Sequence, residues 1–269
     1  MQQGYILEPK LLNIHHGFNF RDLGGYQTKA GQTIRSHKVI RSAKLDLLSD
    51  RDQAYLVNYG LKTDVDFRSP EEQLKEPDRV PTGVDYHFVP VFPTDETKNS
   101  TKPENLQEKF SSDPQAGFEN MVTTYRDLVN LDSSKKAYRT FFDLLLANEA
   151  DHDALLFHCS AGKDRTGMGA VYLLSALDVD PATIRQDYLA ANRYIQEPLE
   201  EMLKHVRQSG GNDNLAQSMT DLWTVNGAYL DSALQTITSE YGNMANYLKD
   251  ELKLSDSQQQ DLRRLYLEA

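Results

Sequence analysis

One short apolar run constrains the fold of this chain more than any other feature. Residues 154–158 read ALLFH, and after a polar loop the stretch 166–177 is again mostly apolar. A continuous apolar run of this length is typical of a strand buried on both faces of a parallel sheet. The second stretch is long enough for a helix. The pattern therefore predicts a strand, a loop and a helix at the centre of an α/β fold.

Short β-like runs precede this unit and helical patterns follow it. This order favours a three-layer α/β fold with a mostly parallel central sheet and a helical C-terminal flank. We expect a single domain over residues 1–269, since the chain shows no internal repeat and is long enough to bury one large core. The elements expected before the flank are strands at 39–42, 63–67 and 86–92 and helices at 50–59, 118–131 and 135–147.

The stretch 93–117 differs from its surroundings. It is polar and has neither helical nor strand periodicity. A segment of this length without a pattern is usually functional or disordered. We therefore expect residues 93–117 to form a lid over a site or a disordered insertion.

The charge balance excludes several partners. The chain has 29 Lys and Arg against 40 Asp and Glu, and its formal charge is −11. Nucleic acids and anionic membranes are bound by basic surfaces, so we expect neither as a partner. An anionic ligand would need a locally positive pocket inside this negative envelope.

The N-terminus carries no export signal of the ordinary kind. Residues 1–10 lack a basic stretch followed by an apolar run, and no apolar stretch in the chain approaches the roughly 18 residues that span a bilayer. We expect a cytoplasmic protein without an integral membrane segment. Leaderless export, or export after processing, stays open.

The chain has a single cysteine, Cys159. One cysteine excludes an internal disulfide and a thiolate-rich zinc site. His15 and His16 are adjacent and would point apart, and Asp64 and Asp66 are too short a signal for a Mg²⁺ site of the haloacid-dehalogenase kind. We therefore expect neither a metal nor a cofactor.

The loop between the central strand and helix has the pattern of a phosphate site. It reads HCSAGKDRTG from His158 to Gly167. Backbone N–H groups at a helix N-terminus can surround one anion, and an arginine can bind two phosphate oxygens at once. Glycine allows the backbone angles that such a loop needs. The predicted phosphate-binding residues are Ser160, Ala161, Gly162, Lys163, Asp164 and Arg165.

The same surroundings favour a reactive sulfur at Cys159. A thiol at a helix N-terminus beside cations ionises more easily than a free one. A thiolate in line with a bound phosphorus is a nucleophile for phosphoryl transfer. The alternative is a buried structural cysteine beside a neutral turn, which leaves the charged run from Lys163 to Arg165 unexplained. Arg21, Arg41 and Arg68, if they lie nearby, would add to a cationic well.

This loop resembles the signature of the cysteine-dependent protein tyrosine phosphatases, and its fuller form is similar to an atypical bacterial branch of that family. The upstream blocks NFRDLGG, IRS and DVDFRSPEE resemble those of the same branch, in the same order. The resemblance covers most of the chain and implies a tyrosine-phosphatase-like fold. It also implies a phosphocysteine intermediate and inhibition by phosphate or vanadate.

The resemblance implies a role for each loop residue. Cys159 is the nucleophile, Arg165 holds the phosphate, and Thr166 assists the sulfur as a leaving group. We expect His158 to order the loop and the sulfur rather than to act as an acid or base.

Two residues are candidates for the general acid. The only Trp, Trp223, is followed by Thr and Val, so the Trp-Pro-Asp loop of the classical enzymes is absent. The bacterial branch favours the Asp inside the loop, which is Asp164. Asp66 is the second candidate, and it could instead orient Arg165 or a loop amide.

Lys163 bears on the substrate. Phosphatases that act on phosphoinositides often have a lysine at this position, whereas a solvated lysine at a loop tip is the plain alternative. The expected partners are a phosphotyrosine protein or peptide, with phosphoserine and phosphothreonine as further substrates, or a phosphoinositide headgroup. The alternatives are a phosphoinositide phosphatase as the main role and a catalytically silent phosphate-binding module.

Overall fold

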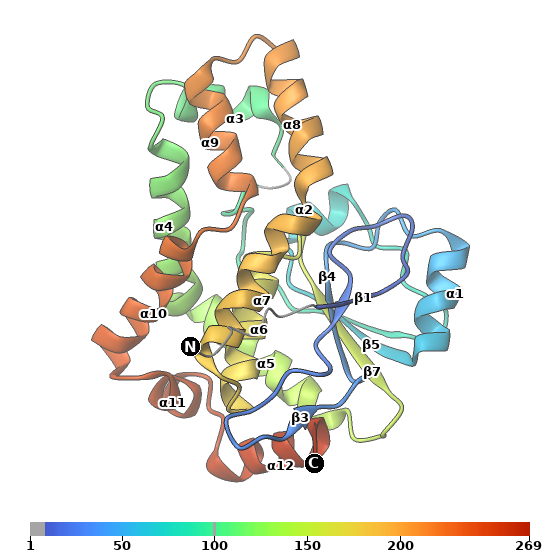
Figure 1. Ribbon diagram of the computed structural model, residues 1–269. Coiled ribbons are helices and arrows are strands. Elements are labelled where there is room, and N and C mark those ends of the chain that lie inside the picture. The colour runs from blue at the N-terminus through green and yellow to red at the C-terminus, as the bar shows by residue number, and fades with distance from the viewer. Residues whose placement is uncertain (1–8, 99–100) are drawn as a thin grey trace, which may run out of the picture.

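The computed structural model describes residues 9–98 and 101–269 (Figure 1). The first eight residues, and Asn99 and Ser100 of the expected lid, lie outside this description. In the described part, a six-stranded sheet has the order β1-β2-β4-β7-β5-β6. The last four strands are parallel, and β2 is antiparallel to both of its neighbours, β1 and β4. The strands, in sheet order, are Lys10–Leu11, Arg21–Asp22, Val39–Ser42, Ala154–His158, Leu61–Asp66 and Asp85–Phe88.

The predicted central strand is confirmed. β7 lies between β4 and β5 and is buried at every residue. Leu155 and Phe157 join one apolar cluster and Leu156 joins the other, because successive side chains of a strand point to opposite faces. The fold is therefore a layered α/β arrangement with a mostly parallel sheet, as expected.

Helices cover both faces of this sheet. α1 packs against β5 on one face, and α6 packs against β4 and β7 on the other (Figure 1). No helix in the described ranges is both long and apolar enough to cross a membrane. The helices are α1 (Asp50–Tyr59), α2 (Pro70–Lys75), α3 (Pro103–Phe110), α4 (Ala116–Asn130), α5 (Asp132–Ala147), α6 (Arg165–Ala176), α7 (Pro181–Tyr194), α8 (Gln196–Gln208), α9 (Asp213–Trp223), α10 (Gly227–Tyr241), α11 (Met244–Asn246), the π-helix Tyr247–Glu251 and α12 (Asp256–Tyr266).

Local capping sets the ends of α1. Ser49 and Asp52 form a reciprocal capping box at its start. Gly60 ends the helix with φ 108°, a left-handed conformation that glycine adopts at little cost. The helix occupies the predicted range 50–59. After α12 the chain returns to pair β8 (Leu267–Glu268) with β3 (Thr33–Ile34), a pairing that the sequence pattern does not reveal.

The segment 93–117 is partly folded. Residues 103–110 form α3, which packs against α8 and α9. Leu106 and Phe110 are buried in the main core. An insertion that is disordered throughout is therefore the wrong expectation for this stretch, whereas its role as a lid stays a prediction.

Candidate active site

The predicted phosphate loop joins the end of β7 to the start of α6. Its carbonyl groups are held from outside: Asn19 Nδ2 donates to the carbonyls of Ala161 and Gly162, at 3.0 and 2.9 Å. Arg41 Nη2 donates to the Gly162 carbonyl at 2.9 Å. Every peptide bond of the described chain is trans, so each N–H points opposite to the carbonyl of its own peptide unit. The N–H groups of Gly162 and Lys163 therefore point away from Asn19 and Arg41, as the predicted phosphate site requires.

Gly162 is required for this conformation. Its φ is +68°, in the left-handed region. A Cβ atom there would lie 2.3 Å from the carbonyl oxygen of Ser42, on β4. The loop therefore packs too closely on β4 to accept a side chain at this position.

The groups that hold the loop form a buried network that the sequence did not reveal. Arg21 Nε and Arg41 Nη1 donate to the carboxylate of Asp187 on α7, at 3.1 and 2.5 Å. Arg21 also donates to the side chain of Asn19. Burial disfavours the ionised carboxylate, but Arg41 and Arg21 hold the pKa of Asp187 below its ordinary value.

The cationic well expected from the sequence is smaller than predicted. Asp187 offsets the charge of Arg21 and Arg41. Arg68 is fully buried and pairs with Asp66 at 2.8 Å and with Asp78. Arg41 therefore contacts the loop directly, whereas Arg68 does not, and the charges of all three arginines are largely compensated.

Arg165, the predicted phosphate clamp, is locked in place by Glu72. The Arg165 Nη1 and Nη2 atoms donate to the two Glu72 carboxylate oxygens, at 2.6 and 2.8 Å. Burial opposes ionisation of Glu72, yet the Arg165 guanidinium holds its pKa well below the ordinary value. The side chain of Ser160 also donates to Glu72. The orienting role considered for Asp66 thus falls to Glu72.

The segment that follows β6 reaches the same arginine. Arg165 Nη2 donates to Thr97 Oγ1 at 3.2 Å, and Thr97 in turn donates to Asp95 at 2.9 Å. Thr97 is fully buried. Part of the predicted lid therefore lies against the phosphate clamp.

Cys159 directly follows β7, and Thr166 lies in the first turn of α6. The Cys159 side chain is 1% exposed, at the end of β7. The Thr166 hydroxyl is buried in the first turn of α6 and has no hydrogen-bond partner among the described residues. That Thr166 assists the Cys159 sulfur as a leaving group stays a prediction.

Asp164 and Lys163 form a buried pair. Lys163 Nζ donates to Asp164 Oδ2 at 2.6 Å, and the Tyr125 hydroxyl donates to Asp164 Oδ1 at 2.9 Å. The Tyr188 hydroxyl donates in turn to Tyr125 at 2.9 Å. Lys163 is fully buried, so the alternative of a solvated lysine at the loop tip is wrong.

Asp66 and His158 belong to a second buried cluster beneath the loop. Asp66 accepts hydrogen bonds from Arg68 and from the Tyr86 hydroxyl, the latter at 2.8 Å. His158 Nε2 lies 3.3 Å from Asp78 and 3.4 Å from Asp64. Burial opposes the imidazolium, but the carboxylates of Asp78, Asp66 and Asp64 raise the pKa of His158 to about 10. Burial raises the pKa of Asp64 to about 7.

This cluster also has the spacing of a metal-ligand set. Asp64, Asp78 and His158 each offer one atom within 4.8 Å of the others. The raised pKa of His158 favours the protonated ring, which has no lone pair at Nε2 for a metal. A protonated His158 ring between Asp78 and Asp64 accounts for this grouping without a metal.

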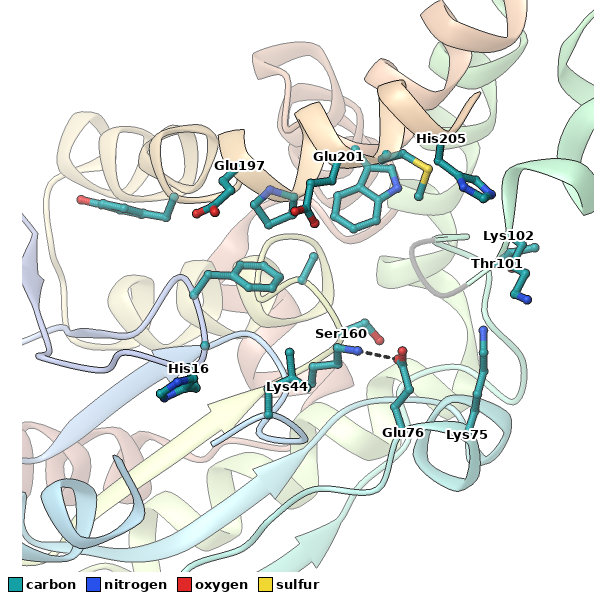
Figure 2. Close-up of a pocket in the computed structure, with 18 of the residues that line it drawn as sticks. His16, Lys44, Lys75, Glu76, Thr101, Lys102, Ser160, Glu197, Glu201 and His205 are labelled. Atoms are coloured by element: carbon teal, nitrogen blue, oxygen red, sulfur yellow. Dashed lines mark ion pairs between the residues drawn. The ribbon is translucent and has the colours of Figure 1, made fainter. Parts of the chain in front are cut away.

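A cavity of about 790 Å³ opens above the loop. Ser160 and Ala161 line its floor together with Lys44, and α8 forms the opposite wall (Figure 2). Lys44 pairs with Glu76 at 2.7 Å, beside the loop. The predicted phosphate loop therefore lies beneath a cavity that is large enough for more than a phosphate group.

Comparison with known proteins agrees with this geometry. The sequence profile described as the tyrosine phosphatase family matches residues 12–268. A Cupriavidus necator protein, provisionally named a tyrosine-protein phosphatase, is 32% identical over 93% of this chain and 85% of its own length. The triple specificity protein phosphatase PtpB of Mycobacterium tuberculosis is 28% identical over 87% of this chain and 91% of its own. The chain therefore belongs to the tyrosine phosphatase family and is a tyrosine-protein phosphatase.

Proposed function

We propose that the protein hydrolyses phosphotyrosine through a phosphocysteine intermediate at Cys159. The thiolate attacks phosphorus, the bond from phosphorus to the tyrosine oxygen breaks, and an acid protonates the leaving oxygen. Water then attacks the phosphocysteine, the sulfur leaves as thiolate, and inorganic phosphate is released. The observation that carries the proposal is the loop held open by Asn19 and Arg41 from outside, with Arg165 fixed by Glu72.

Asp164 is the acid we propose, and the residue that then activates the water. It belongs to the loop that surrounds the phosphate. Its present partners are Lys163 and Tyr125. To protonate the leaving oxygen, Asp164 has to exchange one of these contacts for the substrate. Asp66 is the weaker candidate, because Arg68 and Tyr86 already hold its carboxylate.

Hydrolysis of p-nitrophenyl phosphate in the presence of EDTA tests the reaction. We expect turnover without added metal, its loss in Cys159→Ser, and inhibition by phosphate and vanadate. A requirement for Mg²⁺ would contradict the thiolate mechanism. Binding of phosphate without turnover would leave the alternative, a silent phosphate-binding module.

We also propose a wider substrate range. A relative is named a triple specificity phosphatase, which supports more than one substrate class. We propose phosphoserine and phosphothreonine beside phosphotyrosine, with phosphoinositides as a further class. Lys163 was the sequence signal for phosphoinositides, and in the structure its charge faces Asp164 rather than the cavity. A Lys163→Ala variant that loses phosphoinositide and phosphotyrosine activity equally would remove the lipid-specific role.

Residues 93–117 are the proposed cover of the site. The contact between Thr97 and Arg165 supports this role, because a bound phosphate would compete for the same guanidinium. Limited proteolysis of this segment with and without vanadate tests it, and cleavage that vanadate does not change would count against a lid.

A further inference from the structure

The cavity above the phosphate loop has walls of opposite charge. Glu197 and Glu201 come from α8 and point into the cavity from above (Figure 2). Lys75 and Lys102 lie together at the other end of the same cavity, on the side of α2 and α3. The cavity therefore has one end lined by glutamates and one end lined by lysines.

The two glutamates, which we call the acidic wall, both lie on α8 and line the cavity. They are one helical turn apart and share one face of α8, an arrangement of like charges that costs helix stability. Both are exposed, and neither has an ion-pair partner among residues 9–98 and 101–269. In contrast, His205 on the same helix pairs with Glu104 at 2.5 Å.

Apolar side chains line the same cavity as the acidic wall. Phe18, Met202 and Trp223 line the cavity, and the Trp223 indole N–H is buried with no hydrogen-bond partner among the described residues. Such surfaces suit the ring of a phosphotyrosine and the stem of a long flanking side chain.

We propose that Glu197 and Glu201 select phosphotyrosine peptides that carry a Lys or Arg on one side of the phosphotyrosine. This inference rests on the proposed function. The phosphate binds the loop, and the flanking cation meets the acidic wall across the cavity. Selection is confined to one side because Lys75 and Lys102 hold the other end.

The same features make a phosphoinositide in a bilayer a poorer substrate than a phosphotyrosine peptide. An anionic lipid surface would face the acidic wall and a chain of net charge −11. Cys159 is only 1% exposed, so a headgroup held at a flat surface has little reach to it. A phosphotyrosine side chain, in contrast, carries its phosphate away from the peptide backbone and can extend into the cavity.

Matched phosphotyrosine peptides test this inference. Each peptide carries Arg, Ala or Glu at one flanking position, on either side in turn, and kcat/KM is measured at low salt. The variants are the double substitution Glu197→Gln with Glu201→Gln and the control Glu200→Gln, since Glu200 is exposed on α8 but does not line the cavity. p-Nitrophenyl phosphate, which has no flanking residue, is run in parallel.

We expect wild-type enzyme to prefer Arg over Glu peptides by about 5- to 10-fold on one side, the effect of two partly exposed ion pairs. The double variant loses this preference, Glu200→Gln keeps it, and all three hydrolyse p-nitrophenyl phosphate alike. Three results would each overturn the inference. They are equal efficiency for all peptides, a preference that survives the double substitution, and higher efficiency on phosphatidylcholine vesicles containing phosphatidylinositol 3-phosphate than on the peptides. Failure on p-nitrophenyl phosphate would instead contradict the proposed function, and binding of the same peptides to Cys159→Ser would then decide the selectivity.

Discussion

Glu72 and Arg165 are joined by two hydrogen bonds of 2.6 and 2.8 Å, between a helix that follows β5 and the helix that follows β7. Both side chains are almost fully buried. A bidentate pair fixes the plane of the guanidinium, so the groups that will meet a phosphate are oriented before it binds. The pair connects the capping box of α2, where Glu72 also accepts from the Ser69 N–H, to the chemistry of the loop.

Glu72→Gln should therefore lower kcat/KM for p-nitrophenyl phosphate by about 10- to 100-fold, the effect expected when a positioned group moves. Gln keeps the size of the side chain but loses one of the two acceptors. The matched control is Glu71→Gln, because Glu71 is exposed on the same helix. Wild-type kinetics in a folded Glu72→Gln protein would show that Arg165 is oriented by other contacts.

Gly162→Ala should disrupt the phosphate loop. The added Cβ would lie 2.3 Å from the Ser42 carbonyl oxygen, at a residue with φ +68°. We expect a loss of kcat/KM on the order of 100-fold. Gly31→Ala is the control, since Gly31 also has positive φ (+85°) but has open space around it. There the substitution should cost only the backbone strain, about 1–2 kcal/mol of stability. Equal effects in both variants on thermal unfolding and kinetics would refute the role of the close contact.

Asp164→Asn should slow hydrolysis most for substrates with basic leaving groups. A general acid contributes about 10²–10⁴-fold, and an activated aryl oxide needs it least. The rates of a series of aryl phosphates measure this dependence, with Asp66→Asn as the comparison. A rate loss that is the same for every leaving group would remove Asp164 from the role of acid.

Asp64 makes the stability depend on pH. Burial raises its pKa from 3.8 to about 7, so the folded state binds a proton more tightly than the unfolded state. This contribution to stability is present below the unfolded pKa and is lost as pH rises toward 7. The free energy of unfolding of wild type should therefore fall relative to Asp64→Asn by about 1.4 kcal/mol per pH unit across this window.

Denaturant unfolding from pH 4 to pH 8 measures this difference, with Asp85→Asn as the control because Asp85 is exposed on the neighbouring strand β6. Parallel curves for wild type and Asp64→Asn would mean that Asp64 stays ionised in the fold.

The parts of the fold that the sequence predicted are those set by local pattern. The apolar run of β7, the apolar helix after the loop, and the caps of α1 at Ser49 and Gly60 are determined by neighbours in the chain. The strands β1, β2, β3 and β8 were missed because each has two residues and exists only through its pairing with a distant segment.

In the site, too, the sequence predicted the residues that are close together in the chain and missed the contacts between distant segments. Cys159 and Arg165 share one loop, so their spacing is visible in the sequence. Glu72 is 93 residues from Arg165, and its only local signal is the capping box with Ser69. The arginines Arg21 and Arg41 were expected as free positive charge, and no local pattern indicated that Asp187 would offset them.

The most direct test of the central claim is the site of covalent phosphate during turnover. Enzyme mixed with p-nitrophenyl phosphate is denatured rapidly and digested, and the peptides are analysed by mass spectrometry. The thiolate mechanism predicts phosphate on the peptide that contains Cys159, and none in Cys159→Ser. Turnover with phosphate on an aspartate peptide, or with no phosphate on Cys159 at any time, would contradict it.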